Sequence, residues 1–338
     1  MWEQIRSNQI RSVLLVALMG VLLLALGYFL GLYFFGDAIA GLIIAIVVWA
    51  FMNLIAFFQG DSILLAVSGA RKITRDDHPR LYNIVEEMKI ASGLPVMPDI
   101  YIIDDPAMNA FATGRGQNRA AIAVTSGLLQ NLNRDELQGV IGHEMSHIQN
   151  RDVLLMSLLS VMLGSIVILA WYASRFLFFT GGSGSRRRGS SGGGNPAQLI
   201  ILIVGLVLMI LAPILAQLIY FAVSRKREYL ADASSALYTR YPEGLASALE
   251  KLATSNTQVK AANQATAPMY TINPFQKKGM SMSDVTSTHP PIAERIRILR
   301  SMAGVSPADY EQAYRKIKGK GIMPPSALTA AGTVGIRA

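Results

Sequence analysis

The stretch Asn133-Arg-Asp-Glu136-Leu-Gln-Gly-Val-Ile-Gly-His143-Glu144-Met-Ser-His147 decides how the rest of the chain is interpreted. Asn133 followed three residues later by Glu136 resembles a capping box, which begins a helix. In that helix, His143 and His147 lie one turn apart on the same face, so both imidazoles can bind one tetrahedral zinc ion. Glu144 then lies beside the metal, where it can take a proton from zinc-bound water and deliver it to a leaving amine. The pattern indicates metal-assisted hydrolysis of an amide.

A catalytic zinc site also needs a third protein ligand and an open position. The chain contains no cysteine, so this ligand must be a histidine, an aspartate or a glutamate. The best candidate lies in Ser224-Arg-Lys-Arg-Glu228-Tyr-Leu-Ala-Asp232, where one carboxylate can bind the metal and the other can hydrogen-bond to a ligand histidine. We assign the metal to Glu228, while an ordinary charged helix flank is the alternative interpretation. The prediction is one Zn²⁺ per chain.

Four long apolar stretches suggest contact with lipid. Hydrophobic residues make up 51% of the chain and charged residues only 16%, whereas an ordinary soluble protein has roughly 25% charged residues. The stretches are Val13 to Phe35, Ile39 to Phe58, Val153 to Phe179 and Leu199 to Val223. At about 1.5 Å per residue, each is long enough to cross a hydrocarbon core. Buried helices of a soluble core seldom run so far without polar interruption, and the first stretch is too long for a signal peptide.

Basic residues predict the orientation of the first two stretches. Arg6 and Arg11 precede the first, and Arg71, Lys72 and Arg75 follow the second. Short loops rich in lysine and arginine stay in the cytoplasm, so both ends of this hairpin are expected there.

The third and fourth stretches are joined by a flexible Gly/Ser-rich segment, Gly181 to Pro196, which contains three consecutive arginines. If both stretches cross the membrane, this loop contradicts the positive-inside rule, so either the earlier spans dominate or this pair dips in without crossing. His147 lies six residues before Val153, and Glu228 lies five residues after Val223. Because both must reach one metal, the pair must leave and return on the same side.

The polar segments predict a small mixed domain. Asp76 to Ser92 has the spacing of an amphipathic helix. Asp99 to Ile103 and Ala120 to Thr125 are predicted strands, separated by a turn-rich stretch with Gly114 and Gly116. Further helices are expected over Pro242 to Ala253 and Pro290 to Met302, and the residues from Met323 are expected to be poorly ordered.

Four motifs together resemble the HtpX-type bacterial membrane proteases, relatives of the eukaryotic prenyl-protein (CaaX) endopeptidases and other gluzincins. They are His143-Glu-Met-Ser-His147, the block from Ser224 to Asp232, Asn109-Ala-Phe-Ala-Thr-Gly114 and Ser287-Thr-His289-Pro290. The resemblance covers nearly the whole chain. It implies zinc ligation by His143, His147 and Glu228 and catalysis by Glu144, in agreement with the spacing argument.

The same resemblance implies further roles. Asp232 is expected to support a ligand histidine. Asn109, Ala110 and Phe111 are expected to bind substrate along a strand edge, which would explain a broad specificity. His289 is expected to donate a hydrogen bond to the tetrahedral intermediate, although a histidine before two prolines also suits a helix start. His78, also before a proline, is expected to be structural.

The expected fold is mainly α with a small β-sheet: an integral membrane protein with four apolar helices and a gluzincin-like zinc protease domain. The predicted organisation is a transmembrane hairpin (1–60), a first protease segment with the HExxH helix (61–152), a second transmembrane or membrane-associated hairpin (153–223), a second protease segment with the third ligand (224–322) and a flexible tail (323–338).

The expected function is a zinc metalloendopeptidase of the bacterial cytoplasmic membrane, with its active site on the cytoplasmic side. Its expected substrates are misfolded membrane proteins or unfolded polypeptides. A site-specific processing protease of the CaaX type is one alternative. A metal transporter is another, but transporters place their ligands near mid-membrane, whereas these flank the spans. The net charge of +9 is interpreted as a topology signal and not as nucleic-acid binding, because no base-reading motif is present.

Overall fold

The computed structural model describes residues 2–157, 225–255, 257, 290–323 and 328, together with scattered positions between 163 and 215. The chain divides into two compact units. The first contains Met1–Ile10, Gln59–Ser157 and Phe221–Ala338, and the second contains Arg11–Phe58 and Leu158–Tyr220. All the elements that build the candidate site belong to the first unit.

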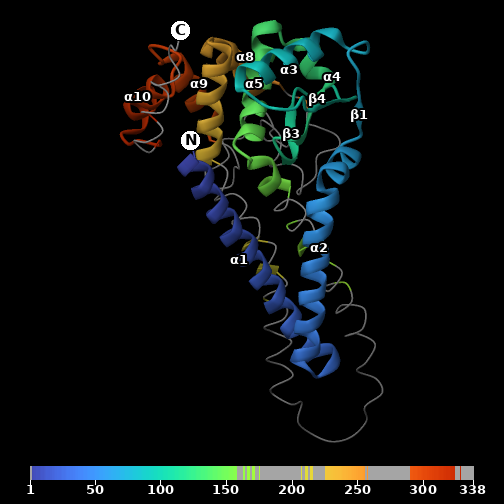
Figure 1. The fold of residues 1–338 in the computed structure, drawn as a ribbon. Coiled ribbons are helices and arrows are strands. Elements are labelled where there is room, and N and C mark those ends of the chain that lie inside the picture. The colour runs from blue at the N-terminus through green and yellow to red at the C-terminus, as the bar shows by residue number, and fades with distance from the viewer. Residues whose placement is uncertain are drawn as a thin grey trace, which may run out of the picture. The chain divides into compact units, whose positions relative to one another are not determined.

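Two long helices begin the chain: α1 (Trp2–Phe35) and α2 (Ala38–Val67) (Figure 1). They approach closely through glycines, since a Cβ added at Gly31 would lie 2.6 Å from the Cα atom of Gly41. A Cβ added at Gly41 would lie 2.2 Å from the carbonyl oxygen of Gly27. Backbone contact through small residues is typical of helix pairs in membranes.

Within the part of the chain that the structure describes, α2 is the one helix that is long and apolar enough to cross a membrane. Only 11% of its most apolar stretch is buried. A shorter apolar helix, Val16–Leu32, lies within α1. The first two predicted spans are therefore helical. The third and fourth, Val153 to Phe179 and Leu199 to Val223, fall mostly outside the described residues, so four membrane helices remain a prediction.

A four-stranded mixed sheet lies in the first unit. Its strands are β1 (Ala70–Lys72), β2 (Asp99–Ile103), β3 (Ala110–Gly116) and β4 (Arg119–Thr125), in the order β1-β2-β4-β3. β2 and β4 pair in parallel, and the other two pairs are antiparallel. The two predicted strands are confirmed as β2 and β4, and β3 lies at an edge of the sheet.

The prediction of a turn-rich stretch around Gly114 and Gly116 was wrong in part, because this stretch is the end of strand β3. Both glycines have positive φ, of 136° and 139°, and the register shifts between them. A Cβ added at Gly114 would lie 2.3 Å from the carbonyl oxygen of Arg119. The glycines therefore permit a bulge and a close strand approach, which a composition rule interprets as a turn.

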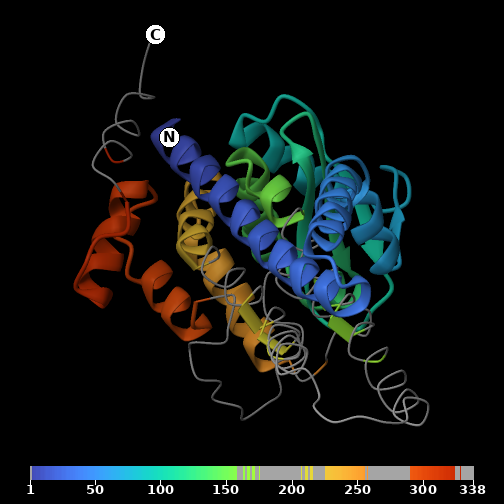
Figure 2. The same ribbon diagram turned by 90° about the horizontal axis from the view of Figure 1, so that it is seen from below.

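Helices surround this sheet and extend the unit. They are α3 (Pro79–Ser92), α4 (Ser126–Asn131), α5 (Arg134–Gln149), residues 225–239, α8 (Pro242–Thr254), α9 (Ile292–Arg300) and α10 (Pro307–Lys318). Figures 1 and 2 show the helices of residues 225–254 between the sheet and α10. The overall class, mostly helical with a small mixed sheet, agrees with the prediction.

Proline and histidine decide where two of these helices begin. α3 starts at Pro79 instead of Asp76, and the Nδ1 atom of His78 accepts a hydrogen bond from the backbone N–H of Leu81 at 3.1 Å. His78 thus caps the helix, as its structural assignment anticipated. α9 starts at Ile292, two residues after the predicted Pro290.

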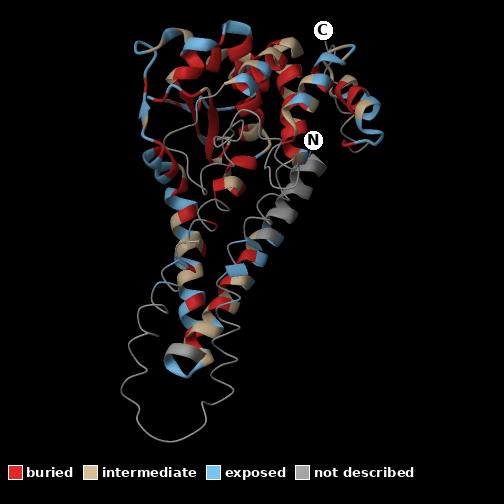
Figure 3. Ribbon diagram, turned by 180° about the vertical axis from the view of Figure 1, so that it is seen from behind, coloured by how far each residue is buried: buried red, intermediate tan, exposed pale blue. Residues whose placement is uncertain are grey.

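The core forms where α5 packs between α3 and α8 (Figure 3, buried residues in red). Val140 and Ile141 of α5 and Leu249 of α8 are fully buried in it. A Cβ added at Gly139 would lie only 2.6 Å from the backbone nitrogen of Leu245, so the glycine allows α5 and α8 to touch.

Glu136 connects the start of α5 to α8. Its carboxylate accepts hydrogen bonds from the Asn133 backbone at 2.8 Å, from Ser247 Oγ at 2.7 Å and from Lys251 Nζ at 2.7 Å. Burial by itself would raise the pKa of Glu136, but these three donors outweigh it and lower the pKa. The predicted capping box is therefore confirmed, and it also joins two helices.

We expect Glu136→Gln to lower the free energy of unfolding by about 1–3 kcal/mol, because a buried charge-assisted hydrogen bond is lost. Since the pKa of Glu136 is lowered on folding, this contribution is present above about pH 4.5 and disappears as the pH falls through the lowered value. The difference between wild type and variant should therefore shrink in acid. Chemical denaturation in detergent at several pH values measures it.

Glu86→Gln is the matched control. Glu86 lies on α3, its side chain is 46% exposed, and its contact with Arg75 is 3.8 Å long. An exposed pair of this kind contributes little to stability, about 0–1 kcal/mol. Equal losses in the two variants would show that Glu136 does not hold α5 against α8.

Candidate metal centre

Helix α5 presents two imidazoles to the same point. His143 and His147 lie one turn apart, with ring centroids 4.9 Å apart and ring planes at 86°. Their Nε2 atoms are 3.3 Å apart. α5 ends two residues later at Gln149, and Arg151 then adopts a positive φ of 59°. The capping box at one end and this sharp turn at the other fix the length of the helix that carries both rings.

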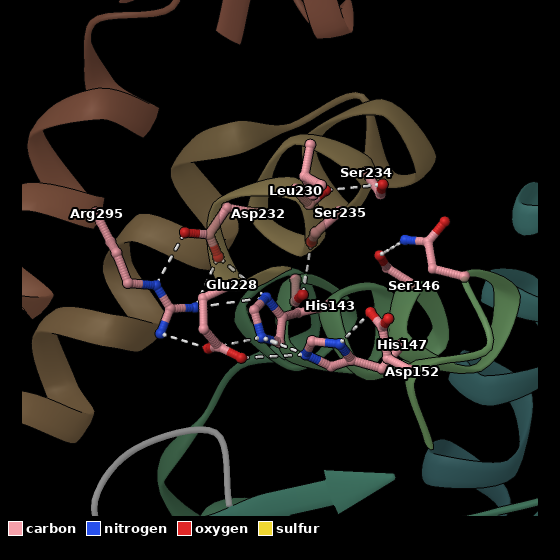
Figure 4. A network of polar contacts seen from close by, with 12 residues as sticks. His143, Ser146, His147, Asp152, Glu228, Leu230, Asp232, Ser234, Ser235 and Arg295 are labelled. Atoms are coloured by element: carbon pink, nitrogen blue, oxygen red, sulfur yellow. Dashed lines mark hydrogen bonds and ion pairs between the residues drawn. The ribbon is translucent and has the colours of Figure 1, made fainter. Parts of the chain in front are cut away.

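The helix of residues 225–239 brings a carboxylate to these rings (Figure 4). Glu228 Oε2 lies 3.5 Å from His143 Nε2, and Glu228 Oε1 lies 3.4 Å from His147 Nε2. Ser235 Oγ donates a 2.7 Å hydrogen bond to the carbonyl oxygen of Gly139, which ties the two helices together. One potential ligand atom from each of His143, His147 and Glu228 lies within 4.8 Å of the others.

A buried carboxylate and a buried guanidinium orient the first ring. Asp232 Oδ1 lies 3.0 Å from His143 Nδ1. Arg295 on α9 donates from Nε and Nη2 to the two oxygens of Asp232, at 2.9 Å and 2.6 Å. Arg295 Nη2 is farther from His143 Nδ1, at 3.4 Å. We therefore place a proton on Nδ1 of His143 and assign its hydrogen bond to the carboxylate of Asp232. The Nε2 lone pair of His143 then points to Glu228. The side chains of His143, Asp232 and Arg295 are all 0% exposed.

A second pair of a buried carboxylate and a buried guanidinium orients the ring of His147. Asp152, in the helical residues 152–157, has Oδ2 at 3.3 Å from His147 Nδ1. Its other oxygen, Oδ1, lies 3.2 Å from Nη1 of Arg227. Asp152 is 3% exposed and Arg227 6% exposed. Each histidine therefore has a carboxylate at Nδ1 and an arginine behind that carboxylate, which is the outer-shell arrangement common at metal-binding histidines.

The electrostatics of this cluster favour a cation. Burial alone would lower the pKa of His147, but Asp152 and Glu228 outweigh it and raise the pKa to about 10. Burial would also lower the pKa of His143, but hydrogen bonds to Asp232 and Glu228 outweigh it and raise that pKa. The four carboxyl groups, including Glu144, exceed the two guanidinium groups by two formal charges. A divalent ion would balance that surplus.

The donor set fits a transition metal. It offers two imidazole Nε2 atoms, whose Nδ1 sides are taken by carboxylates, and one carboxylate. Nitrogen and oxygen donors of this kind suit a divalent transition metal, and three protein ligands leave a position open. Glu144 follows His143 directly on α5 and is 2% exposed. A carboxylate that could act as a general base thus lies next to the first histidine, out of bulk water.

The remaining predicted site residues have different outcomes. Asn109, just before β3, and Ala110 and Phe111, its first two residues, are buried, with exposures of 1%, 1% and 2%. The Asn109 backbone N–H donates to Thr125 Oγ1 at 2.9 Å. These exposures include the backbone, so the structure shows no free surface at these three residues, and substrate binding along them remains a prediction. His289 lies outside the described residues, so its role remains a prediction.

Three residues of this site were missed by sequence reasoning. Asp152 lies five residues after His147, and Arg227 directly precedes Glu228, yet no role in the site was predicted for either residue. Arg295 lies on a helix that was predicted, but nothing in the local sequence points toward the metal. An acidic residue soon after the second histidine was the available signal for Asp152.

Comparison with known proteins identifies the family of this chain. Peptidase family M48 matches residues 75–303. A protease HtpX homolog from Dictyoglomus turgidum is 46% identical over 301 residues, covering 89% of this chain and 94% of the relative. One from Streptococcus mutans is 42% identical over 302 residues, covering 89% and 100%. The crystal structure of Ste24p from S. mikatae is similar with a TM-score of 0.47 and 22% identity, over 88% of this chain and 67% of that one. The chain belongs to peptidase family M48, as a metalloprotease of the HtpX type.

Proposed function

We propose that this metalloprotease is a zinc endopeptidase of the bacterial cytoplasmic membrane that cleaves misfolded or damaged membrane proteins on the cytoplasmic side. One observation carries the proposal: ligand atoms of His143, His147 and Glu228 meet within 4.8 Å, with Glu144 next to the first histidine. The donor set of two imidazoles, one carboxylate and an open position suits zinc best.

The chain's own residues hold the site in a reactive form. Asp232 and Asp152 accept the Nδ1 protons of His143 and His147, so each Nε2 lone pair is directed at the same point. When bound there, zinc lowers the pKa of a water molecule toward 7 and stabilises negative charge on the substrate carbonyl oxygen. Glu144 takes a proton from the attacking water and delivers it to the nitrogen of the leaving amine.

Strand β3 supports a broad substrate choice. Among the described strands β3 pairs only with β4, and in this proposal an extended peptide pairs with its other edge. Backbone hydrogen bonds of this kind do not depend on the peptide's side chains. Asn109, Ala110 and Phe111 are at most 2% exposed as whole residues, so this pairing requires the segments that cover the edge to move aside.

The apolar helices support a membrane location. Large hydrophobic side chains along α2 are exposed, among them Ile43, Val47 and Phe51. Such a surface marks contact with lipid or with another protein. Basic residues in the first part of α1 and after the end of α2 support the cytoplasmic placement of the protease unit. The remaining two apolar segments complete the proposed membrane part.

The first test compares Glu144→Gln with Glu228→Ala in full-length protein. Glu144→Gln is expected to keep its zinc and to lose peptide cleavage by about 10²–10⁴-fold, because general acid–base catalysis contributes that much. Glu228→Ala is expected to lose zinc as well as activity, because a metal ligand is removed. Metal content by mass spectrometry and cleavage of an unfolded protein measure the two effects.

Asp135→Asn provides a control, since Asp135 is an exposed acidic residue in the first turn of the same helix. It should retain both zinc and activity. Full activity of Glu144→Gln would reject the assigned proton transfer, and unchanged zinc in Glu228→Ala would reject the third ligand.

The second test concerns the carboxylate behind His147. We expect Asp152→Asn to weaken zinc binding about 10–100-fold, because an outer partner that orients a ligand histidine is lost. Competition with a zinc chelator measures the affinity. Rescue by Asp152→Glu, together with an unaltered circular dichroism spectrum, would separate an orienting role from a general loss of structure. Unchanged zinc affinity in Asp152→Asn would contradict that role.

The third test concerns where substrates are presented. One unfolded sequence is supplied in two forms to wild-type enzyme in lipid nanodiscs, either attached to a membrane span or free in solution. The attached form is expected to be cleaved faster, because the site is proposed to lie beside the bilayer. Glu144→Gln should cleave neither form.

Equal rates for the two forms would remove the argument for membrane substrates. The positions of the cuts then give a second readout. Many scattered cuts support quality control, whereas a single site would support the processing activity of CaaX type.

A further inference from the structure

A cavity of about 490 Å³ lies apart from the metal-ligand cluster, between the start of the helix 225–239 and the end of α10. Its polar lining comes from Arg225, Lys226, Tyr229, Glu294, Lys318 and Lys320. The first three belong to the helix that carries Glu228. Lys318 lies in the last turn of α10, and Lys320 lies two residues after that helix ends. Two distant parts of the sequence thus bring basic side chains to one hollow.

The charge of this cavity is unbalanced. Four cationic side chains and one carboxylate line it, which gives a formal charge of +3. The carboxylate of Glu294 is already engaged by Lys318 Nζ at 2.8 Å and by the hydroxyl of Tyr229. Among the described residues, neither Lys226 nor Lys320 has an ion-pair partner. Like charges gathered in this way repel one another, so an anion bound between them would be stabilised.

The inner wall of the cavity is aromatic and carries no opposing charge. The rings of Tyr229 and Tyr314 meet edge to face with centroids 4.9 Å apart, and both residues are 5% exposed. Burial and the neighbouring Glu294 raise the pKa of the Tyr229 hydroxyl, so it remains neutral. The cavity therefore combines a basic rim with an inner wall whose tyrosine hydroxyl is uncharged and does not repel an anion held at the rim.

The chain holds this rim close to an apolar segment. Arg225 follows Val223, the last residue of the apolar run 199–223, by two residues. Two residues of fully extended chain span at most about 7 Å, so the backbone of Arg225 lies within that reach of the run's end. The chain passes from the apolar unit into the protease unit between Tyr220 and Phe221. If the run lies in the bilayer, Arg225 and Lys226 lie at the depth of the lipid headgroups.

We propose that this cavity binds the phosphodiester headgroup of an anionic phospholipid in the leaflet beside the protease unit. This inference rests on the membrane location in the proposed function. The phosphate lies among Arg225, Lys226, Lys318 and Lys320, and the apolar chains continue into the bilayer. Juxtamembrane clusters of lysine and arginine attract anionic lipids in this way. The bound lipid links the end of α10 to the helix that supplies Glu228.

The test measures lipid binding directly. Full-length, zinc-loaded protein in detergent is titrated with phosphatidylglycerol, with phosphatidylcholine of the same acyl chains and with inorganic phosphate, and bound species are counted by native mass spectrometry. Wild type is expected to prefer phosphatidylglycerol. Lys226→Gln/Lys320→Gln is expected to bind it about 30-fold more weakly, since each basic residue near an anionic lipid contributes about 1 kcal/mol.

Arg297→Gln/Lys316→Gln is the matched control. It removes two positive charges from exposed positions on α9 and α10 that do not line the cavity. Its phosphatidylglycerol affinity should equal that of wild type, and Lys226→Arg/Lys320→Arg should also bind normally because it restores the charge. Equal weakening in both glutamine variants would overturn the site, since only net charge would then matter.

Two further outcomes are informative. One distinguishes a lipid headgroup from a free anion, and the other distinguishes failure of the lipid site from failure of the proposed protease function. If inorganic phosphate binds as tightly as phosphatidylglycerol and depends on the same two lysines, the occupant is a free anion and the lipid is rejected. Because the readout is binding and not cleavage, loss of lipid selectivity in a fully active enzyme would reject this site alone. Failure of the zinc and Glu144 test would leave the lipid measurement unaffected.

Discussion

The buried ion pair between Arg295 and Asp232 is the interaction on which the candidate metal centre depends. Arg295 is 0% exposed, and such a buried charge is tolerated only when it is paired and hydrogen-bonded. Asp232 pairs with it through two oxygens, at 2.9 Å and 2.6 Å, and Glu228 Oε2 lies 3.5 Å from its Nη1 atom. Removing either carboxylate would leave uncompensated charge in the core. The pairing therefore fixes α9 against the helix 225–239, and through Asp232 it fixes the ring of His143.

Close helix packing gives this network its short distances. Gly139 and Gly142 lie on the face of α5 that meets α8 and the helix 225–239. A Cβ at Gly142 would lie 3.1 Å from Ser235 Oγ, and a Cβ at Gly139 would meet the backbone of α8 at 2.6 Å. Glycine is about 1 kcal/mol less favourable than alanine inside a helix. These two glycines therefore destabilise α5 locally but allow the neighbouring helices to approach it closely. Without that proximity, Glu228 would not reach both imidazoles.

The sequence could predict what is local and periodic. The capping box at Asn133, the helix beneath His143 and the strands β2 and β4 follow from patterns within a few residues. Glu228 and Asp232 were also accessible, because their own spacing matches a helical turn and the absence of cysteine narrowed the choice of ligand. In contrast, Arg295 reaches Asp232 from 63 residues away, and this pairing has no periodic signature. Strand β3 was hidden because the glycines that permit its bulge are also typical of turns.

The two carboxylate–arginine pairs also set the chemistry of the ligands. A carboxylate at Nδ1 makes an imidazole a stronger donor at Nε2, which tightens metal binding but reduces the metal's power to polarise a water or a carbonyl. An arginine behind that carboxylate withdraws part of its charge, so the ligand is oriented without becoming excessively electron-rich. Asp232 with Arg295 and Asp152 with Arg227 apply this balance to both histidines. A metal ion held by His143, His147 and Glu228 would then keep enough Lewis acidity to act on a water or a carbonyl near the carboxylate of Glu144.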